Sequence, residues 1–242
     1  MNLTRLLTEG TGAWLHFEFS CNRSGLFSEK YLTVPIGQIL SAWAADRVQA
    51  EYRHPVLGPL AKGPGRRPEV DFVVFEKYPK IKYAVESKWV GNTKPSVQSI
   101  LWDLIRLEMI ANSEGAECIF LLGGQRSVLD AFFATEAFYG PKKPHQRRSL
   151  LRVDSNLIHS VPLVPTIPHR VPILRNIFAD YQDVAFPEKV VTRRSAPFPA
   201  EGPLYQYQVY AWKISSPGRR TVFFPRNSKH YRIIDSSNSS RV

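Results

Sequence analysis

The sequence predicts an α/β fold for its first half, with the element order helix, three strands, helix, strand. Two segments repeat apolar residues at helical spacing. Four shorter segments are rich in β-branched or aromatic residues, or run as unbroken apolar stretches. The 242 residues are 43% hydrophobic and 22% charged, which is enough apolar material for a packed core. The length allows one large domain, or one domain with an appendage.

The first predicted helix covers residues 28–49. Ser28 is a suitable N-cap, because its hydroxyl can accept a hydrogen bond from the first turn. Pro35 either splits this helix or marks its true start. The apolar residues that repeat at helical spacing are Leu32, Ile36, Leu40, Trp43 and Ala44.

Three strands are expected next. Residues 48–57 are consistent with a strand, and residues 69–76 and 81–90 have high β-propensity. Only a short segment with a proline separates the last two, so they are expected to form a hairpin.

A second helix and a fourth strand complete this half. Residues 95–115 carry one apolar face, Pro95 suits the first turn of a helix, and Gly115 suits its exit. Residues 116–124 form a continuous apolar run that ends in glycines, as in a buried strand.

The positive charge is confined to the second part of the chain. Residues 1–140 contain 15 Lys+Arg and 15 Asp+Glu, whereas residues 141–242 contain 17 and 6, which accounts for the whole net charge of +11. Composition changes near residues 139–149, so we predict a core of residues 1–140 and a basic, proline-rich region of residues 141–242 that packs on it, binds nucleic acid, or both. A basic region favours a polyanionic partner. Solubility or nonspecific RNA binding is the alternative explanation.

Prolines limit what the last third can form. Residues 161–174 have a proline every few positions, which excludes a central strand and a helix through the middle. We expect an extended segment laid over the domain. In residues 204–225, side chains of different polarity alternate in the first half, a turn is expected at "SSPG", and an apolar run follows. This pattern predicts a β-hairpin.

The sequence indicates a protein of the cytoplasm. It lacks a run of 18 apolar residues, and its N-terminal segment does not resemble a signal peptide. Cys21 and Cys118 are too few for a disulfide framework or a zinc site, and the histidines show no metal-ligand spacing. No membrane partner is expected.

Three charged residues interrupt the two strands of the predicted hairpin. Because side chains alternate along a strand, Glu86 and Lys88 share one face. If the neighbouring strand brings Asp71 alongside, two carboxylates and a lysine converge. Two close carboxylates repel each other unless a cation lies between them, and oxygen ligands favour Mg²⁺ or Mn²⁺. A divalent ion beside a lysine suits phosphoryl transfer. Solvated charges on a sheet face are the alternative.

The spacing of Asp71 and Glu86-Ser87-Lys88 resembles the PD-(D/E)xK signature of the restriction endonuclease-like nucleases, with Pro68 three residues before the aspartate. The resemblance covers residues 28–124. It implies a central mixed sheet flanked by helices, and a metal ion held by Asp71, Glu86 and the backbone carbonyl of Ser87.

The same resemblance suggests further site residues. Gln98 and Trp102, four residues apart, resemble a glutamine–aromatic pair that some branches carry on the next helix. Packing and surface hydrogen bonding are equally good explanations. Glu29 resembles the carboxylate that many branches carry in the first helix and is expected among the metal ligands, with Glu51 a weaker candidate. An acid in a first turn also suits the helix dipole.

Candidate phosphate contacts lie in basic pairs along the chain. The pair before the second predicted strand, Arg66 and Arg67, could equally belong to a solvated turn. The residues are Arg66, Arg67, Lys142, Lys143, Arg147, Arg148, Arg219 and Arg220.

The expected function is a Mg²⁺-dependent endonuclease acting on DNA, alone, as a homodimer or in a larger DNA-processing complex. Two alternatives stay open. One is a catalytically silent nuclease fold kept for nucleic-acid binding or assembly. The other is a nuclease acting on RNA, since the preference for DNA comes from the resemblance alone.

Overall fold

The computed structural model describes residues 2–61, 68–140, 149–164, 166–216 and 221–233. The helices are α1 Leu3–Ser20, α2 Glu29–Ala44, α3 Val97–Glu114, α4 Arg126–Phe133, α5 Glu136–Tyr139 and α6 Val171–Phe178. The strands are β1 Val48–Tyr52, β2 Val70–Lys77, β3 Lys80–Val90, β4 Glu117–Gln125, β5 Ile158–Pro162, β6 Phe186–Pro187, β7 Lys189–Arg194, β8 Tyr207–Ser215 and β9 Val222–Phe223.

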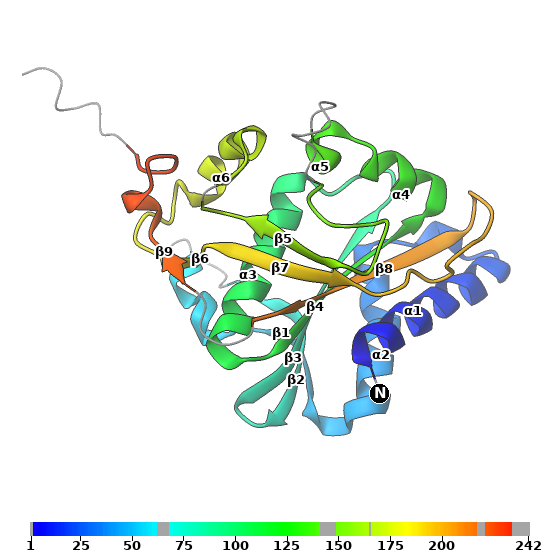
Figure 1. The fold of residues 1–242 in the computed structure, drawn as a ribbon. Coiled ribbons are helices and arrows are strands. Elements are labelled where there is room, and N and C mark those ends of the chain that lie inside the picture. The colour runs from blue at the N-terminus through cyan, green and yellow to red at the C-terminus, as the bar shows by residue number, and fades with distance from the viewer. Residues whose placement is uncertain (1, 62–67, 141–148, 165, 217–220, 234–242) are drawn as a thin grey trace, which may run out of the picture.

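A mixed sheet of seven strands forms the centre of the described structure, in the order β1-β2-β3-β4-β8-β7-β5 (Figure 1). β3 and β4 are parallel and the other neighbours are antiparallel. The prediction of an α/β fold with a mixed central sheet flanked by helices is confirmed. Strands β5, β7 and β8 of the later part of the chain continue the same sheet, because β8 pairs with β4 along its whole length, whereas β6 and β9 form a separate pair.

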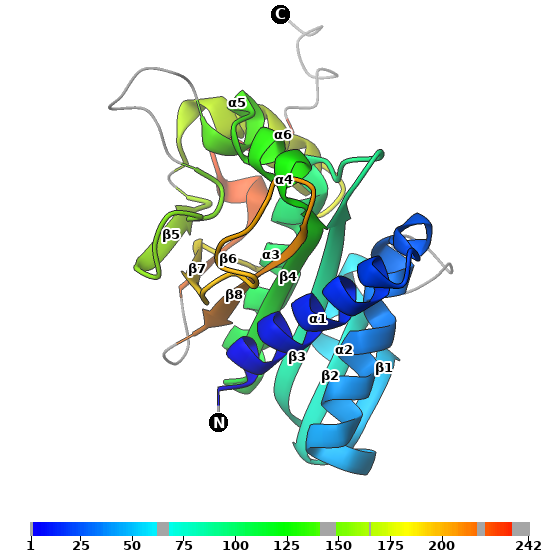
Figure 2. The same ribbon diagram turned by 90° about the vertical axis from the view of Figure 1, so that its right-hand side faces the viewer.

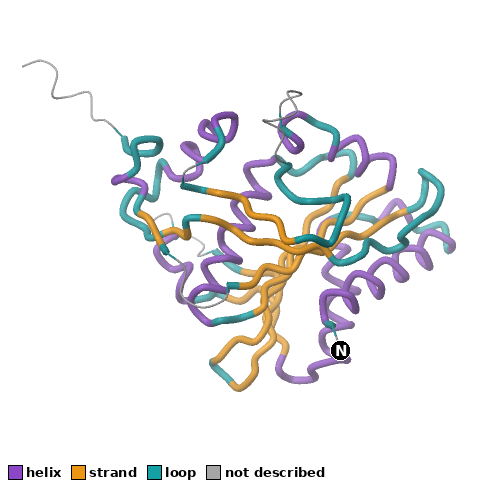
Figure 3. The backbone as a smooth tube through the Cα atoms, in the orientation of Figure 1, coloured by secondary structure: helices purple, strands orange, loops and turns teal. Residues whose placement is uncertain are grey.

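Helices cover both faces of the sheet. Figures 2 and 3 show α1 and α2 together on one face, and Figure 1 shows α3 on the other. The strand alternation matches these layers: Phe72 and Val85 pack beneath α1 and α2, whereas Val73 and Ala84 pack in the core beneath α3. The central strands β2, β3, β4 and β8 are therefore largely buried from both sides, whereas the edge strand β1 is not.

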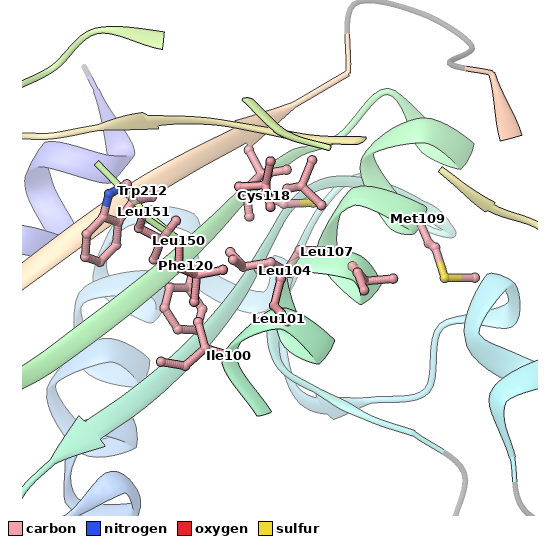
Figure 4. Close-up of a cluster of buried hydrophobic side chains, with 14 of the residues drawn as sticks. Ile100, Leu101, Leu104, Leu107, Met109, Cys118, Phe120, Leu150, Leu151 and Trp212 are labelled. Atoms are coloured by element: carbon pink, nitrogen blue, oxygen red, sulfur yellow. The ribbon is translucent and has the colours of Figure 1, made fainter. Parts of the chain in front are cut away.

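The core beneath α3 is continuous with the later part of the chain. Figure 4 shows Leu101 and Leu104 of α3 close to Phe120 of β4, together with Leu150 and Leu151. All five side chains are fully buried. Residues after 140 thus help to enclose the core that positions α3.

Local signals in the sequence mark both helices correctly. The Ser28 hydroxyl caps α2 by accepting from the Tyr31 N–H, and Pro35 lies inside the helix. Gly115 ends α3 with a φ of 69°, a left-handed conformation that favours glycine. The N-cap of α3 is Ser96, so Pro95 precedes the helix and does not enter its first turn.

Two predictions about the last third are wrong. Residues 204–225 do not form a hairpin, because β8 is held on its two edges by β4 and β7, and β9 pairs with β6 instead. Residues 161–174 are not one extended segment. They contain the end of edge strand β5 and the start of α6, and Pro172 takes a place in the first turn, where its missing N–H costs nothing.

Helix α1 was not predicted, and neither were α4, α5 and α6. α1 contains two glycines, Gly10 and Gly12, which lower helix propensity. A Cβ at position 12 would lie 2.7 Å from the carbonyl oxygen of Phe198, so close packing requires the glycine there. No helix in the described residues is long and apolar enough to cross a membrane.

Candidate active site

The candidate site lies where β2 begins. β2 starts at Val70 while β3 continues to Val90, and the pairing of Phe72 with Val85 sets Asp71 opposite Glu86. Asp71 is two residues from Val73, and Glu86 is two residues from Ala84, so both carboxylates point to the α3 side of the sheet. The hairpin therefore brings together the two acids that the sequence singled out.

Asp71 is held by the strand opposite. Its Oδ2 accepts hydrogen bonds from the backbone N–H and the hydroxyl of Ser87, both at 2.8 Å. Burial raises the pKa of Asp71, and the two hydrogen bonds from Ser87 oppose that rise. The carboxyl group is fixed in orientation but is costly to ionise without a cation nearby.

Glu86 belongs to a buried ion network. Its side chain is only 2% exposed, and its Oε1 lies 2.6 Å from Nη2 of Arg106. The same Nη2 lies 2.7 Å from Oδ1 of Asp103. Burial raises the pKa of Glu86 well above its ordinary value, the Asp103 carboxylate raises it further, and the Arg106 guanidinium opposes the rise.

Lys88 joins the network from the far side. Its Nζ lies 2.8 Å from Oε1 of Glu29 and 3.2 Å from Oδ2 of Asp103. Burial lowers the pKa of Lys88, but the carboxylates of Asp103, Glu29 and Glu86 outweigh it and raise the pKa overall. Lys88 is therefore a charged ammonium group at neutral pH. Glu29, expected among the metal ligands, contacts this lysine in the structure.

A surface hollow of about 400 Å³ opens beside Asp71. Glu51, the weaker carboxylate candidate, lies on its wall with a φ of 49°, which is strained for a residue with a side chain. β1 pairs with β2 on each side of this position, so Glu51 faces the start of β2 beside Asp71. The remaining wall residues are Pro68, Glu69, Val70, Trp102 and Arg106.

Gln98 lies outside that hollow. Its exposed side chain lines a second hollow of about 350 Å³, which shares Trp102 with the first. The Trp102 ring stacks on Tyr181, with centroids 5.1 Å apart and planes 15° apart. The structure thus separates Gln98 from Asp71 and places Trp102 between them.

Sequence reasoning missed two members of the network, Asp103 and Arg106. Both lie on α3, three residues apart, which places them side by side on the helix next to the apolar residues Ile100 and Leu104. Arg106 also donates from Nη1 to the backbone carbonyl of Glu69, at 2.9 Å. An acid and a base bordering the buried face of a helix were the available signal.

The donor atoms suit a hard divalent cation in kind and in charge. The network contains two cations, Lys88 and Arg106. It contains four carboxylates, each of which contacts Ser87 or one of these cations: Asp71, Glu86, Asp103 and Glu29. With all groups ionised the formal charge is −4 plus +2, or −2, and oxygen ligands match Mg²⁺ or Mn²⁺. Among the described residues, no three His, Cys, Asp or Glu side chains already form a metal-binding group. A metal would therefore need water or substrate oxygens as well.

The predicted phosphate contacts fall outside the described residues. This applies to all eight: Arg66, Arg67, Lys142, Lys143, Arg147, Arg148, Arg219 and Arg220. Their arrangement around the site stays a prediction.

Comparison of the chain with models of protein families, with curated proteins and with solved structures gives no match.

Proposed function

We propose that this protein is a metal-dependent nuclease with a restriction endonuclease-like core that hydrolyses phosphodiester bonds in DNA. The supporting observation is the convergence of Asp71, Glu86 and Lys88 at the start of β2, beside a surface hollow. Two carboxylates next to a charged amine are the groups that phosphoryl transfer needs.

Each residue has a distinct role in this proposal. Asp71 and Glu86, with the backbone carbonyl of Ser87, would hold Mg²⁺ or Mn²⁺. A bound divalent cation would supply charge neutralisation of the phosphate and a more acidic water. Lys88 orients the attacking water or stabilises the charge that develops on the phosphate oxygens. Asp103 and Glu29 keep the lysine charged and in place, because they contact its Nζ from two sides.

The burial of the carboxylates supports the need for a cation. Asp71 and Glu86 both have raised pKa values, chiefly because burial disfavours their charge. A divalent cation would reverse this shift, because opposite charge favours the ionised form. The site is thus preorganised at a cost that metal binding would remove.

A cleavage assay tests the proposal directly. The full chain is incubated with supercoiled, linear, single-stranded and branched DNA, and with RNA, in Mg²⁺, Mn²⁺ or EDTA. We expect nicking or linearisation of supercoiled DNA with either metal and none in EDTA. Cleavage of RNA but not of DNA would support phosphodiester hydrolysis at this site with RNA as the substrate. Absence of cleavage from every substrate and metal contradicts the proposal.

A second function is favoured by one contact. The Oε1 atom of Glu86 already has a cation partner in Arg106 at 2.6 Å, so the network can exist as a closed structural ion cluster. In that case the protein is a catalytically silent nuclease fold that binds nucleic acid or assembles with a DNA-processing complex. DNA binding without cleavage in any metal would support this alternative.

Metal binding gives an independent prediction. We expect calorimetry to detect weak Mn²⁺ binding by the wild type, and loss of that binding in Asp71→Asn. The amide keeps the shape of the side chain but removes the charge that attracts the ion.

Asp130→Asn is the matched control, because Asp130 is an exposed acid on α4, far along the chain from the site. Equal Mn²⁺ binding in the wild type and in Asp71→Asn would place the metal elsewhere. Equal loss in both variants would indicate nonspecific attraction to surface charge.

A further inference from the structure

A third hollow, polar and of about 320 Å³, lies on the α1 side of the sheet, opposite the face that carries Glu86. It is located where the N-terminal end of α1 approaches β7 and β8 (Figure 2). The lining residues are Asn2, Thr4, Asn156, Arg193, Arg194, Ser195, Ala196 and Lys213. Because one water occupies about 30 Å³ of liquid, the hollow has room for roughly ten.

Two of its cations lie side by side on neighbouring strands. Arg193 of β7 is the direct pairing partner of Lys213 of β8. Like charges opposite each other on neighbouring strands repel, so this pair is unfavourable by itself. Lys213 has a carboxylate partner in Glu117. Arg193 donates to the backbone carbonyl of Asn156 at 3.2 Å and forms no ion pair within the described part of the chain.

The N-terminus of α1 adds positive potential to the same place. α1 is 18 residues long, and its first turn, which is described completely, contains no acid. The N–H groups of a first turn have no acceptor within the helix, and the helix dipole makes this end positive. The Asn2 side chain caps one of them by accepting from the Arg5 N–H. The helix therefore increases the excess of positive charge.

Thr4 gives an independent sign of a missing ligand. Its side chain is 2% exposed and lines the hollow, and its hydroxyl has no hydrogen-bond partner in the described structure. A buried hydroxyl without a partner is unfavourable, and natural proteins rarely leave one. The hydroxyl has almost no accessible surface of its own, so rotation of the Thr4 side chain would be needed to turn it toward an acceptor in the hollow.

We propose that this hollow binds a phosphate group. A phosphate oxygen can accept from the Thr4 hydroxyl, from first-turn N–H groups of α1, from the free nitrogens of Arg193 and from Lys213. Its negative charge removes the repulsion between the two opposed cations. The site does not depend on the proposed hydrolysis, since Lys213, two residues from Ala211 on β8, lies on the α1 side of the sheet, away from Asp71 and Glu86.

The test uses the full chain and inorganic phosphate, measured by calorimetry at low ionic strength. We expect Arg193→Gln and Thr4→Val each to weaken phosphate binding about tenfold or more, because each removes a hydrogen bond to a charged group. Thr4→Val keeps the shape of the side chain and removes only the unpartnered hydroxyl, so its melting temperature should not fall. Lys189→Gln is the matched control: it removes one exposed charge from β7, four residues and about 13 Å from Arg193.

Two further measurements identify the source of the phosphate. Duplex DNA without terminal phosphates is titrated against the same variants. Weaker binding of both inorganic phosphate and DNA by Arg193→Gln would assign a nucleic-acid backbone phosphate, and weaker binding of inorganic phosphate alone would assign a small phosphate ligand. Undetectable phosphate binding by the wild type, or equal losses in Arg193→Gln and Lys189→Gln, would overturn the proposal.

Discussion

Replacement of Lys88 by methionine is expected to reduce DNA cleavage by at least ~10²–10³-fold, with the protein still folded. Methionine retains the length and apolar stem of the side chain but removes the charge. Lys88 is held by Glu29 and Asp103 at the point where β3 extends past the start of β2. A cation fixed in that position can stabilise developing phosphate charge without reorganisation. Single-turnover cleavage at saturating Mg²⁺ measures the effect on the chemical step.

The control lies on the same strand. Lys80→Met removes an equal charge at the exposed start of β3, where the lysine pairs with Glu76. Full cleavage by this variant, together with loss in Lys88→Met, would tie the effect to the site. Glu86→Gln should also abolish cleavage, because it removes one of the two proposed metal ligands. Wild-type rates in both site variants, with unchanged circular dichroism, would contradict the assignment.

The first half of the fold could be predicted because its signals are local. Apolar spacing marks α2 and α3, and the Ser28 and Gly115 caps mark their ends. Alternation along β3 also predicted that Glu86 and Lys88 share a face. The pairing of Asp71 with Glu86 needed one assumption, a hairpin between β2 and β3, and the register of these strands confirms it.

The second half depends on contacts between distant segments, which leave weak local signals. β8 reads as the first strand of a hairpin, but its two neighbours, β4 and β7, occupy both of its edges. α1 has poor intrinsic propensity because of Gly10 and Gly12, and its packing on the sheet and against Phe198 stabilises it. Tertiary packing outweighs propensity in both cases.

The ion network shows the same limit at the site. Asp71, Glu86 and Lys88 were found because a charge inside an apolar strand is conspicuous. Asp103 and Arg106 were missed because charges on a helix are ordinary, and only the packing of α3 on β3 shows that these two are buried. The role of Arg106 as partner of Glu86 follows from a tertiary distance and not from any spacing in the sequence.

That partnership predicts the largest effect on stability. Arg106→Met is expected to reduce the free energy of unfolding by about 3–5 kcal/mol, the usual cost of removing one member of a buried ion pair. Methionine fills similar space, but Glu86 then loses the cation at 2.6 Å, and Asp103 keeps its contact with Lys88. Urea unfolding in a buffer containing a chelator measures the loss. Arg5→Met, which breaks the exposed pair with Glu9, is the control and should change little.

The pH dependence identifies the cause. The folded-state pKa of Glu86 lies well above its ordinary value of 4.5, so the folded protein binds this proton more tightly than the unfolded chain does. The contribution of Glu86 to stability is therefore fully present below about pH 4.5 and is lost as pH rises through the folded-state pKa. Arg106 lowers that pKa, so its removal moves the loss to higher pH and deepens it.

The deficit of Arg106→Met should accordingly be larger at pH 8 than at pH 5. Adding Glu86→Gln to Arg106→Met should restore part of the stability at pH 8, because the amide removes the buried charge that Arg106 had neutralised. A deficit below about 1 kcal/mol at pH 8 would mean that water or main-chain donors replace the guanidinium. Glu86 would then not depend on Arg106 for a partner, so a metal ion could bind it. The closed ion cluster on which the silent alternative rests would lose its support.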